Sequence, residues 1–155
     1  MIYPILSHDA PAIWPEVSDY VTRALKLTLG QINADSVLER IKTQDMQLWV
    51  IAESAILGAM VTEILIYPNR KILRVVTLGG EGWDNWGSDI VETLDSYAKY
   101  VGATGIEFVG RKGWSKKLAQ HGYSTRCAYF QKELENGQSI NGERGAGTIC
   151  QPIQE

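Results

Sequence analysis

The chain has few of the residues that build metal centres and disulfide frameworks. Its 155 residues include two cysteines and two histidines. Cys127 and Cys150 match neither a metal-ligand spacing nor a disulfide framework, and His8 and His121 lie far apart in the sequence. We therefore expect no metal site and no structural disulfide, in a chain suited to a reduced intracellular environment.

The chain also lacks an excess of positive charge and long apolar runs. Its formal net charge of -3 provides no general attraction to nucleic acid or to anionic membranes. No stretch approaches the roughly eighteen apolar residues of a spanning helix. The opening stretch, MIYPILSHDAP, lacks the basic start and long apolar core of a secretory signal. We accordingly expect no nucleic-acid partner, no membrane and no secretion by a signal peptide.

Two amphipathic helices are expected in the first third of the chain. Hydrophobic content of 45% and charged content of 21% are ordinary for a single soluble domain. After a short apolar strand at residues 1–7, Asp9 is suited to cap a helix, whose apolar residues keep helical spacing until a stop near Gly30. The spacing predicts a second helix over residues 34–43.

The middle of the chain changes to the periodicity of strands. Segments 46–54, 56–68 and 71–80 are rich in Val, Ile and Leu and are separated by short breaks, which predicts an antiparallel meander. A glycine-rich corner follows, and then a helix that ends near Gly102. The remaining predicted elements are a strand at 103–111, a short helix at 113–122 and a final strand at 123–134.

The last part of the chain differs from the rest in composition. Residues 135–155 are polar and glycine-rich and show no periodicity, so they cannot bury a core of their own. We interpret them as a C-terminal tail that follows a domain over residues 1–134. A protein partner is expected to hold this tail in place.

The order of the predicted elements resembles the GNAT fold, the architecture of the GCN5-related N-acetyltransferases. The segments ILSHDAPAIWPEV and KKLAQHGYSTRCAYFQKEL are similar to the family's opening and closing segments. The combination of GGEGWDNW with GRKGWSKKLAQHGY is similar to GNAT-like proteins of tailed bacteriophages. The resemblance covers about residues 1–134 and implies an α/β (α+β) fold. In it, a mixed, mostly antiparallel sheet is flanked by helices.

The resemblance also implies where a cofactor would bind. In GNAT enzymes acetyl-CoA lies between the fourth and fifth strands, and backbone amides at the start of the third helix hold its pyrophosphate. In this chain that turn corresponds to Gly79, Gly80 and Gly82. Arg111 and Lys112 would then grip the phosphates from the opposite wall.

The same corner has a second interpretation, in which it only connects a strand to a helix. Asp84 or Asn85 would cap that helix, since acidic groups near a helix N-terminus stabilise it by about 0.3–1 kcal/mol. Against a diphosphate, Glu81 and Asp84 would each cost about 1–3 kcal/mol at an effective dielectric constant near 20. Both interpretations stay open on the sequence.

The acid and base that the resemblance implies are only partly present. The family's tyrosine, which protonates the departing thiolate, corresponds here to Leu118, and leucine cannot donate a proton. Tyr123 and Tyr129 are the nearest phenols that could replace it. Glu63, on a predicted strand, is the candidate base.

Three further residues are candidate contacts for a protein partner. Trp83 lies on the predicted loop and would serve as an anchor if exposed. Lys116 and Lys117 belong to the densest basic cluster of the chain and could dock on an acidic surface.

Two functions from different classes follow. The first is a non-catalytic binding or assembly module of phage type, located in the host cytoplasm or the virion, whose tail binds protein partners such as virion proteins; it needs no cofactor. The second is an acetyl-CoA-dependent N-acyltransferase that acts on a small amine or a protein amino group. Leu118 in place of the family's tyrosine, and the carboxylates of Glu81 and Asp84 at the phosphate turn, favour the first function. Acetyl-CoA binding is the observation that separates the two.

Overall fold

The chain forms two compact units. The computed structural model describes residues 1–26, 31–128, 130–132 and 134. Unit 1 comprises Met1–Arg111 and unit 2 comprises Lys112–Glu155. Among the described residues, unit 1 holds the sheet and three helices, and unit 2 holds one short helix. The tail predicted at 135–155 lies outside the described residues, so its partner stays a prediction.

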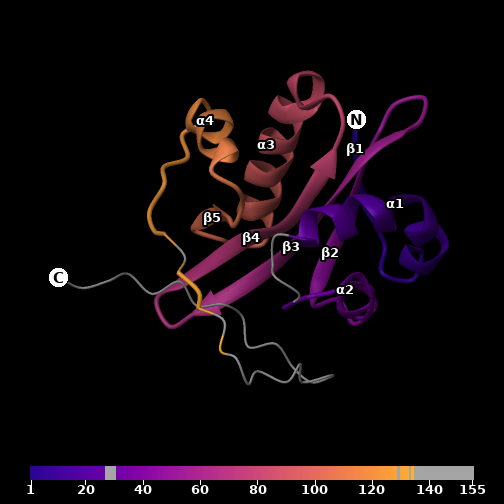
Figure 1. Cartoon of the computed structure of the whole chain (residues 1–155), viewed down its shortest axis with the longest axis horizontal. Helices are drawn as coiled ribbons and strands as arrows, with labels where there is room; N and C mark the ends of the chain where they lie inside the picture. Colours follow the sequence, from indigo (N-terminus) through magenta and orange to yellow (C-terminus); the bar gives the residue numbers. More distant parts are fainter. Residues whose placement is uncertain (27–30, 129, 133, 135–155) are drawn as a thin grey trace. The chain divides into compact units, whose positions relative to one another are not determined.

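A five-stranded mixed sheet is the centre of unit 1. Its strands are β1 (Ile2–Ile5), β2 (Met46–Ala52), β3 (Ile56–Tyr67), β4 (Arg70–Gly80) and β5 (Gly105–Phe108). They lie in sequence order across the sheet, and the first three pairings are antiparallel (Figure 1). β4 and β5 are parallel, which requires a crossover, and a helix provides it. The predicted meander is confirmed, as is the mixed, mostly antiparallel sheet.

Local signals explain where the three helices of unit 1 begin and end. They are α1 (Ala10–Leu25), α2 (Ala34–Lys42) and α3 (Trp83–Tyr100). Asn33 starts α2 with a capping box, in which its side chain and that of Ser36 each bond to the other's backbone amide. Asp9 occupies the cap position of α1 but makes no side-chain cap bond. Gly102, at a φ of 71°, follows the end of α3 as predicted.

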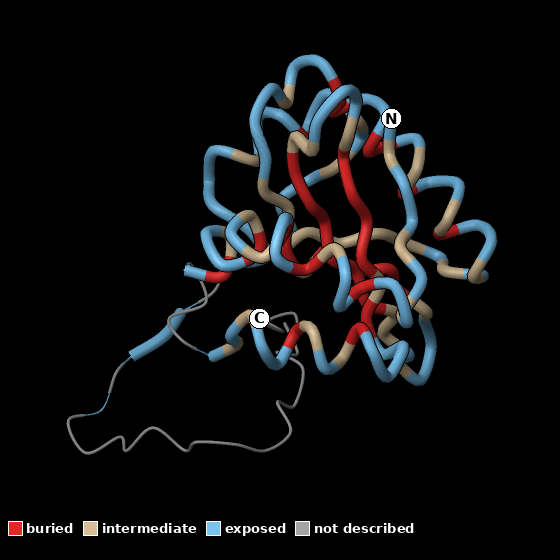
Figure 2. The backbone as a smooth tube through the Cα atoms, turned by 90° about the vertical axis from the view of Figure 1, so that its right-hand side faces the viewer, coloured by how far each residue is buried: buried red, intermediate tan, exposed pale blue. Residues whose placement is uncertain are grey.

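The sheet is buried on both faces, and each face has its own core. Alternation along β2 sends Leu48 and Val50 to the face that α1 and α2 cover, and Trp49 and Ile51 to the face that α3 covers. Figure 2 shows the buried residues concentrated along the central strands. Each fully buried apolar side chain contributes about 1.5–3 kcal/mol, so the two cores together hold the sheet rigidly in place.

Unit 2 differs from the prediction. Its helix α4 (Gly113–Ala119) matches the helix expected at 113–122. The final strand predicted at 123–134 is wrong for the described residues of that segment, which belong to no strand. Alternating residues alone do not make a strand, because a strand needs a partner for its backbone groups. The expectation of no disulfide is also wrong, since Cys127 is disulfide-bonded.

The described helices do not change the expectation about membranes. None of them combines the length and the apolar character that a bilayer span needs.

Candidate functional site

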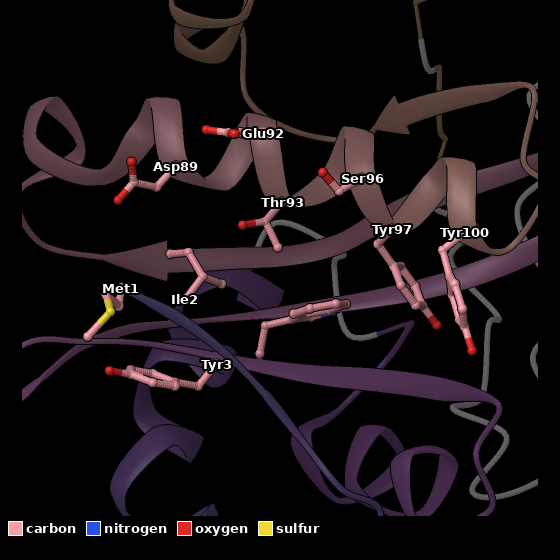
Figure 3. Close-up of a pocket in the computed structure, with 10 residues that line it drawn as sticks. Met1, Ile2, Tyr3, Asp89, Glu92, Thr93, Ser96, Tyr97 and Tyr100 are labelled. Carbon is pink, nitrogen blue, oxygen red and sulfur yellow. The ribbon is translucent and has the colours of Figure 1, made fainter.

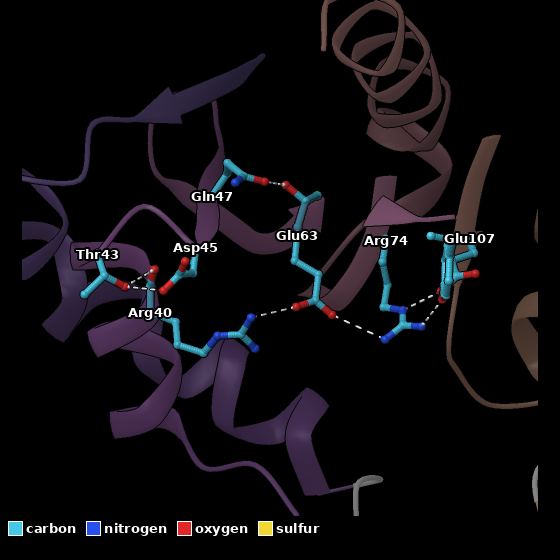
Figure 4. A network of polar contacts seen from close by, with 9 residues as sticks. Arg40, Thr43, Asp45, Gln47, Glu63, Arg74 and Glu107 are labelled. Carbon is cyan, nitrogen blue, oxygen red and sulfur yellow. Dashed lines mark hydrogen bonds and ion pairs between the residues drawn. The ribbon is translucent and has the colours of Figure 1, made fainter. Parts of the chain in front are cut away.

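A line of charged side chains crosses the sheet in unit 1. Glu63 on β3 lies directly opposite Arg74 on β4, and Arg74 lies opposite Glu107 on β5. Arg40, in the last turn of α2, reaches Glu63 from the helix side (Figure 4). Two positive and two negative groups thus alternate along the line, and their charges balance.

Short contacts close this network. Arg40 Nη2 donates to Glu63 Oε2 at 3.0 Å, and Arg74 Nη1 donates to Glu63 Oε1 at 3.4 Å. Arg74 Nε donates to Glu107 Oε1 at 2.5 Å, and its Nη2 donates to the phenol oxygen of Tyr67 at 3.3 Å. The side chains of Glu63 and Arg74 are each 8% exposed, while those of Arg40 and Glu107 are 42% and 36% exposed. The central pair is therefore buried, and both ends of the network meet solvent.

The network changes what Glu63, the predicted base, can do. Both of its oxygens accept hydrogen bonds from guanidinium groups, so neither oxygen is left without a partner. This arrangement suits Glu63 to tie α2, β3 and β4 together.

The sequence holds part of the signal for this network. β3 and β4 are joined by a two-residue connection at Pro68 and Asn69, which sets Tyr67 opposite Arg70. Counting outward from that turn brings Glu63 opposite Arg74. The contact of Arg40 with Glu63 has no such local signal, because it depends on how α2 packs on the sheet.

A bulge interrupts β4 beyond the network. Val61 pairs with Thr77 and Thr62 pairs with Val75, so Val76 is an extra residue on β4. The parallel pairing of β4 with β5 ends at Val75 and Phe108, whereas β4 continues to Gly80 against β3 alone. The bulge therefore lies where one edge of β4 loses its partner strand.

A buried hydroxyl group lies next to this bulge. Thr77 is 4% exposed, and its Oγ1 has no hydrogen-bond partner in the part of the chain that the structure describes. An unsatisfied buried hydroxyl costs about 1–3 kcal/mol, so such a group calls for an explanation. A ligand that supplies a hydrogen-bonding group at this point would remove that cost.

Packing explains two of the three glycines predicted to cradle a phosphate. A Cβ added to Gly79 would lie 2.7 Å from the backbone oxygen of Tyr20 in α1, and one added to Gly80 would lie 2.7 Å from the backbone oxygen of Leu57. Both glycines belong to β4 rather than to a loop. Gly82 differs, because it precedes α3 at a φ of 78°, which favours glycine. These observations support the interpretation of the corner as a packed connection between a strand and a helix.

The start of α3 is filled by aromatic rings. Trp83 is the first residue of α3 rather than a loop residue, and it is half-buried. Its ring meets that of Trp86 edge-on at 5.2 Å, and Trp86 Nε1 donates to the backbone oxygen of Glu81 at 2.6 Å. Glu81 and Asp84 are exposed at this corner, as two carboxylates that an anionic ligand would have to approach.

The other predicted site residues are distributed over both units. Arg111 is exposed at the end of unit 1. In unit 2, Lys112, Lys116 and Lys117 are exposed and Tyr123 is half-buried, whereas Tyr129 lies outside the described residues. Their roles in binding or catalysis stay predictions.

The described residues offer no site for a metal ion. Nowhere among residues 1–26, 31–128, 130–132 and 134 do three His, Cys, Asp or Glu side chains come together in a way that could hold one.

Solved structures identify the architecture. A GCN5-related N-acetyltransferase from Ralstonia eutropha JMP134 matches with a TM-score of 0.65 at 15% identity, over 86% of this chain and 97% of its own. Glucosamine-6-phosphate N-acetyltransferase from Arabidopsis thaliana matches with a TM-score of 0.61 at 15% identity, over 87% and 98%. A predicted acetyltransferase from Clostridium acetobutylicum, solved with acetyl-CoA, matches with a TM-score of 0.62 at 11% identity, over 86% and 96%.

These similarities concern the fold. No protein-family model and no curated protein matches the chain. The matching structures are acetyltransferases, which supports the GNAT part of the resemblance at the level of the fold, and the phage part gains no support from them. The chain has the fold of the GNAT acetyltransferases.

Proposed function

We propose that this protein is an acyl-CoA-dependent N-acyltransferase that acts on a small amine or a protein amino group. The observation that carries the proposal is the buried, unpartnered hydroxyl group of Thr77 at the bulge of β4, where the pairing with β5 ends. The match to an acetyltransferase solved with acetyl-CoA supports it at the level of the fold.

The residues near the bulge fit part of such a ligand and oppose another part. Thr77 Oγ1 can donate to, or accept from, an amide or carbonyl group, both of which occur in the acyl-pantetheine arm of acetyl-CoA. Glu81 and Asp84 oppose the diphosphate, and Gly82 is the one glycine of the corner that packing does not already explain. We assign the acyl arm to β4 beside Thr77 and the diphosphate to the backbone that follows Gly82.

The chain's own contribution to the reaction is to position the reactants. Acetyl-CoA would supply an acyl group activated as a thioester. The amine nitrogen would form a bond to the acyl carbon as the C–S bond breaks, coenzyme A would leave as a thiolate, and the proton of the amine would pass to solvent. Because Glu63 is held by two guanidinium groups, we assign it to keeping β3 and β4 in register, rather than to accepting that proton. Tyr123 and Tyr129 stay the candidate donors of a proton to the thiolate.

Variants that remove a negative charge test this proposal, because they should bind acetyl-CoA more tightly. A variant that merely unfolds could not give this result. Acetyl-CoA is titrated into the protein by calorimetry. If the diphosphate lies near Gly82, Glu81→Gln and Asp84→Asn should each strengthen binding by about two- to fivefold, since each removes a repulsive charge. The gain is smaller than the roughly 1–3 kcal/mol of the unscreened interaction because both carboxylates are exposed and are screened by water and salt. Asp95→Asn makes the same charge change at an exposed position further along α3 and should have little effect.

A second variant tests the acyl arm. Thr77→Val keeps the shape of the side chain and removes the hydroxyl group, so it should weaken acetyl-CoA binding by about fivefold or more while leaving the fold intact. Thiol release with a panel of amines then measures the transfer. The absence of binding heat and of any thermal shift at millimolar acetyl-CoA would rule the proposal out.

The competing function is a non-catalytic binding module, and two observations favour it. Both oxygens of the candidate base, Glu63, are paired with guanidinium groups, and the carboxylates of Glu81 and Asp84 lie exposed at the start of α3. A chain that gives neither heat nor thiol release with acetyl-CoA, and that retains a protein partner, would have this function.

A further inference from the structure

An open groove of about 610 Å³ lies between β1 and α3 within unit 1. Residues 1–3 of the chain and Trp49 of β2 form one side of it (Figure 3). The other side is a stripe of α3 residues at helical spacing, next to the stripe that is buried against the sheet. These residues are Asp89, Glu92, Thr93, Ser96, Tyr97 and Tyr100. The volume falls within the range of roughly 300–1,000 Å³ that is usual for ligand sites.

Aromatic rings dominate one end of the groove. Trp49 and Tyr97 meet edge-on with centroids 5.0 Å apart, and Tyr97 and Tyr100 stack at 6.3 Å. Trp49 is fixed in place, because its Nε1 donates to Thr62 Oγ1 at 3.0 Å. Tyr100 is 86% exposed, which leaves its ring open to a ligand. The negative faces of such rings attract cations.

The charged side chains of the groove are negative. Asp89 and Glu92 lie one helical turn apart on α3, and both are exposed. The positive group among the lining residues is the α-ammonium of Met1, which donates to the backbone oxygen of Ala52 at 3.0 Å. Since no Lys or Arg is among the described residues that line the groove, its carboxylates and aromatic rings together favour a cationic ligand.

The groove has no part in the function proposed above. It shares no residue with the network of Glu63 and Arg74, with the bulge at Val76, or with the corner before α3. A ligand there would contact a different part of α3 from the part assigned to acetyl-CoA.

We propose that this groove is a docking site for a basic, extended segment of a protein partner, with Arg or Lys side chains placed over the rings and beside the two carboxylates. The stripe from Asp89 to Tyr100 spans roughly 16 Å of helix, which is the length of about five residues in an extended chain. The rim exposes Met1, Tyr3 and Tyr100 at 69%, 41% and 86%. Methionine and tyrosine are enriched in protein interfaces, so this rim suits a peptide.

Titration of the full chain with short peptides tests this assignment. The probe is an acetylated and amidated pentapeptide in which glycine and arginine alternate, and the control peptide carries glutamate in place of arginine. The indole N–H resonance of Trp49 reports binding in a nitrogen-15 correlation spectrum. The basic peptide should shift this resonance in a saturable way, and the acidic peptide should not.

Matched variants separate this site from general electrostatics. Asp89→Asn with Glu92→Gln should weaken binding about tenfold, at roughly threefold for each carboxylate. Asp95→Asn with Glu16→Gln removes the same charge at exposed positions outside the groove and should change binding less than twofold. Tyr100→Ala should weaken binding about threefold, whereas Tyr100→Phe keeps the ring and should bind as the parent does.

Several outcomes would overturn the proposal. They are no shift with the basic peptide at millimolar concentration, equal shifts with both peptides, and equal weakening by the two charge-neutralising pairs. If 2-phenylethylammonium binds as tightly as the peptide, the groove is a site for small amines instead of a docking site. None of these results depends on acetyl-CoA, so failure here and failure of the proposed function are distinguishable.

Discussion

Replacing Arg74 by methionine is expected to destabilise unit 1 strongly, through the charges that the replacement leaves behind. Methionine keeps most of the side-chain length but cannot pair with Glu63 or Glu107. Glu63 would retain Arg40 as a partner, but this arginine is 42% exposed and is therefore screened by water. The carboxylate of Glu63, at 8% exposure, would be left largely uncompensated.

The size of the effect follows from this burial. Removing one partner of a buried ion pair costs about 3–5 kcal/mol, whereas replacing both partners by apolar side chains of similar volume is often neutral. Arg74→Met alone should therefore lower the melting temperature by about 10–15 °C in a protein of this size. The double variant Glu63→Met with Arg74→Met should recover most of that loss, because the freed ends of Arg40 and Glu107 both reach solvent.

Urea unfolding followed by tryptophan fluorescence measures these stabilities, with the m-value as a check that unfolding still exposes the same surface. The double-mutant cycle then gives the coupling between the two residues. A loss below about 1 kcal/mol for Arg74→Met, or a double variant less stable than the single one, would show that this network does not stabilise the sheet.

Three further predictions concern other parts of unit 1. Gly79→Ala should cost about 1–3 kcal/mol in a urea titration, since its Cβ would meet a backbone oxygen of α1. The control variant Gly113→Ala lies in α4 of unit 2, where a Cβ would have nothing within 4 Å, and it should change stability by less than about 0.5 kcal/mol. Burial, and to a smaller extent the neighbouring Tyr100, raises the pKa of Tyr97 above the usual 10.0. The stability that Tyr97 contributes is therefore fully present below pH 10.0 and should be lost as the pH rises through the pKa of the folded state. Tyr97→Phe should remove this loss in alkaline unfolding curves. Asn33→Ala removes the capping box of α2 and should cost about 1 kcal/mol in thermal unfolding.

Much of unit 1 could be predicted from the sequence, because its signals are local. The runs rich in Val, Ile and Leu over the β2–β4 region predict the strands of the meander, and the short connections predict their antiparallel order. Helical spacing and stop signals predict the ends of α2 and α3 within a few residues, whereas α1 ends at Leu25 and the stop predicted near Gly30 lies outside the described residues. Where a segment depends on a distant partner the sequence failed, as with the strand predicted at 123–134.

The candidate site was less accessible to sequence reasoning. The sequence predicts Glu63 as a carboxylate on a strand, but its two guanidinium partners come from α2 and β4, and only the second follows from hairpin register. The free hydroxyl group of Thr77 depends on a bulge that one extra residue creates, which no periodicity reveals. The groove between β1 and α3 brings together residues far apart in the chain.

The glycines at the end of β4 show why a motif of that composition has to be interpreted together with its neighbours. Gly79 and Gly80 allow α1 and β3 to approach β4 closely, and Gly58 across the hairpin meets the same constraint, since its Cβ would lie 2.5 Å from the backbone oxygen of Gly79. A need for close packing is therefore enough to explain these three glycines. Gly82 differs from them, because its positive φ at the start of α3, rather than close packing, favours glycine. If acetyl-CoA binds here, its affinity must then come mainly from the acyl-pantetheine arm along β4, because the corner supplies one amide-rich turn and two opposing carboxylates.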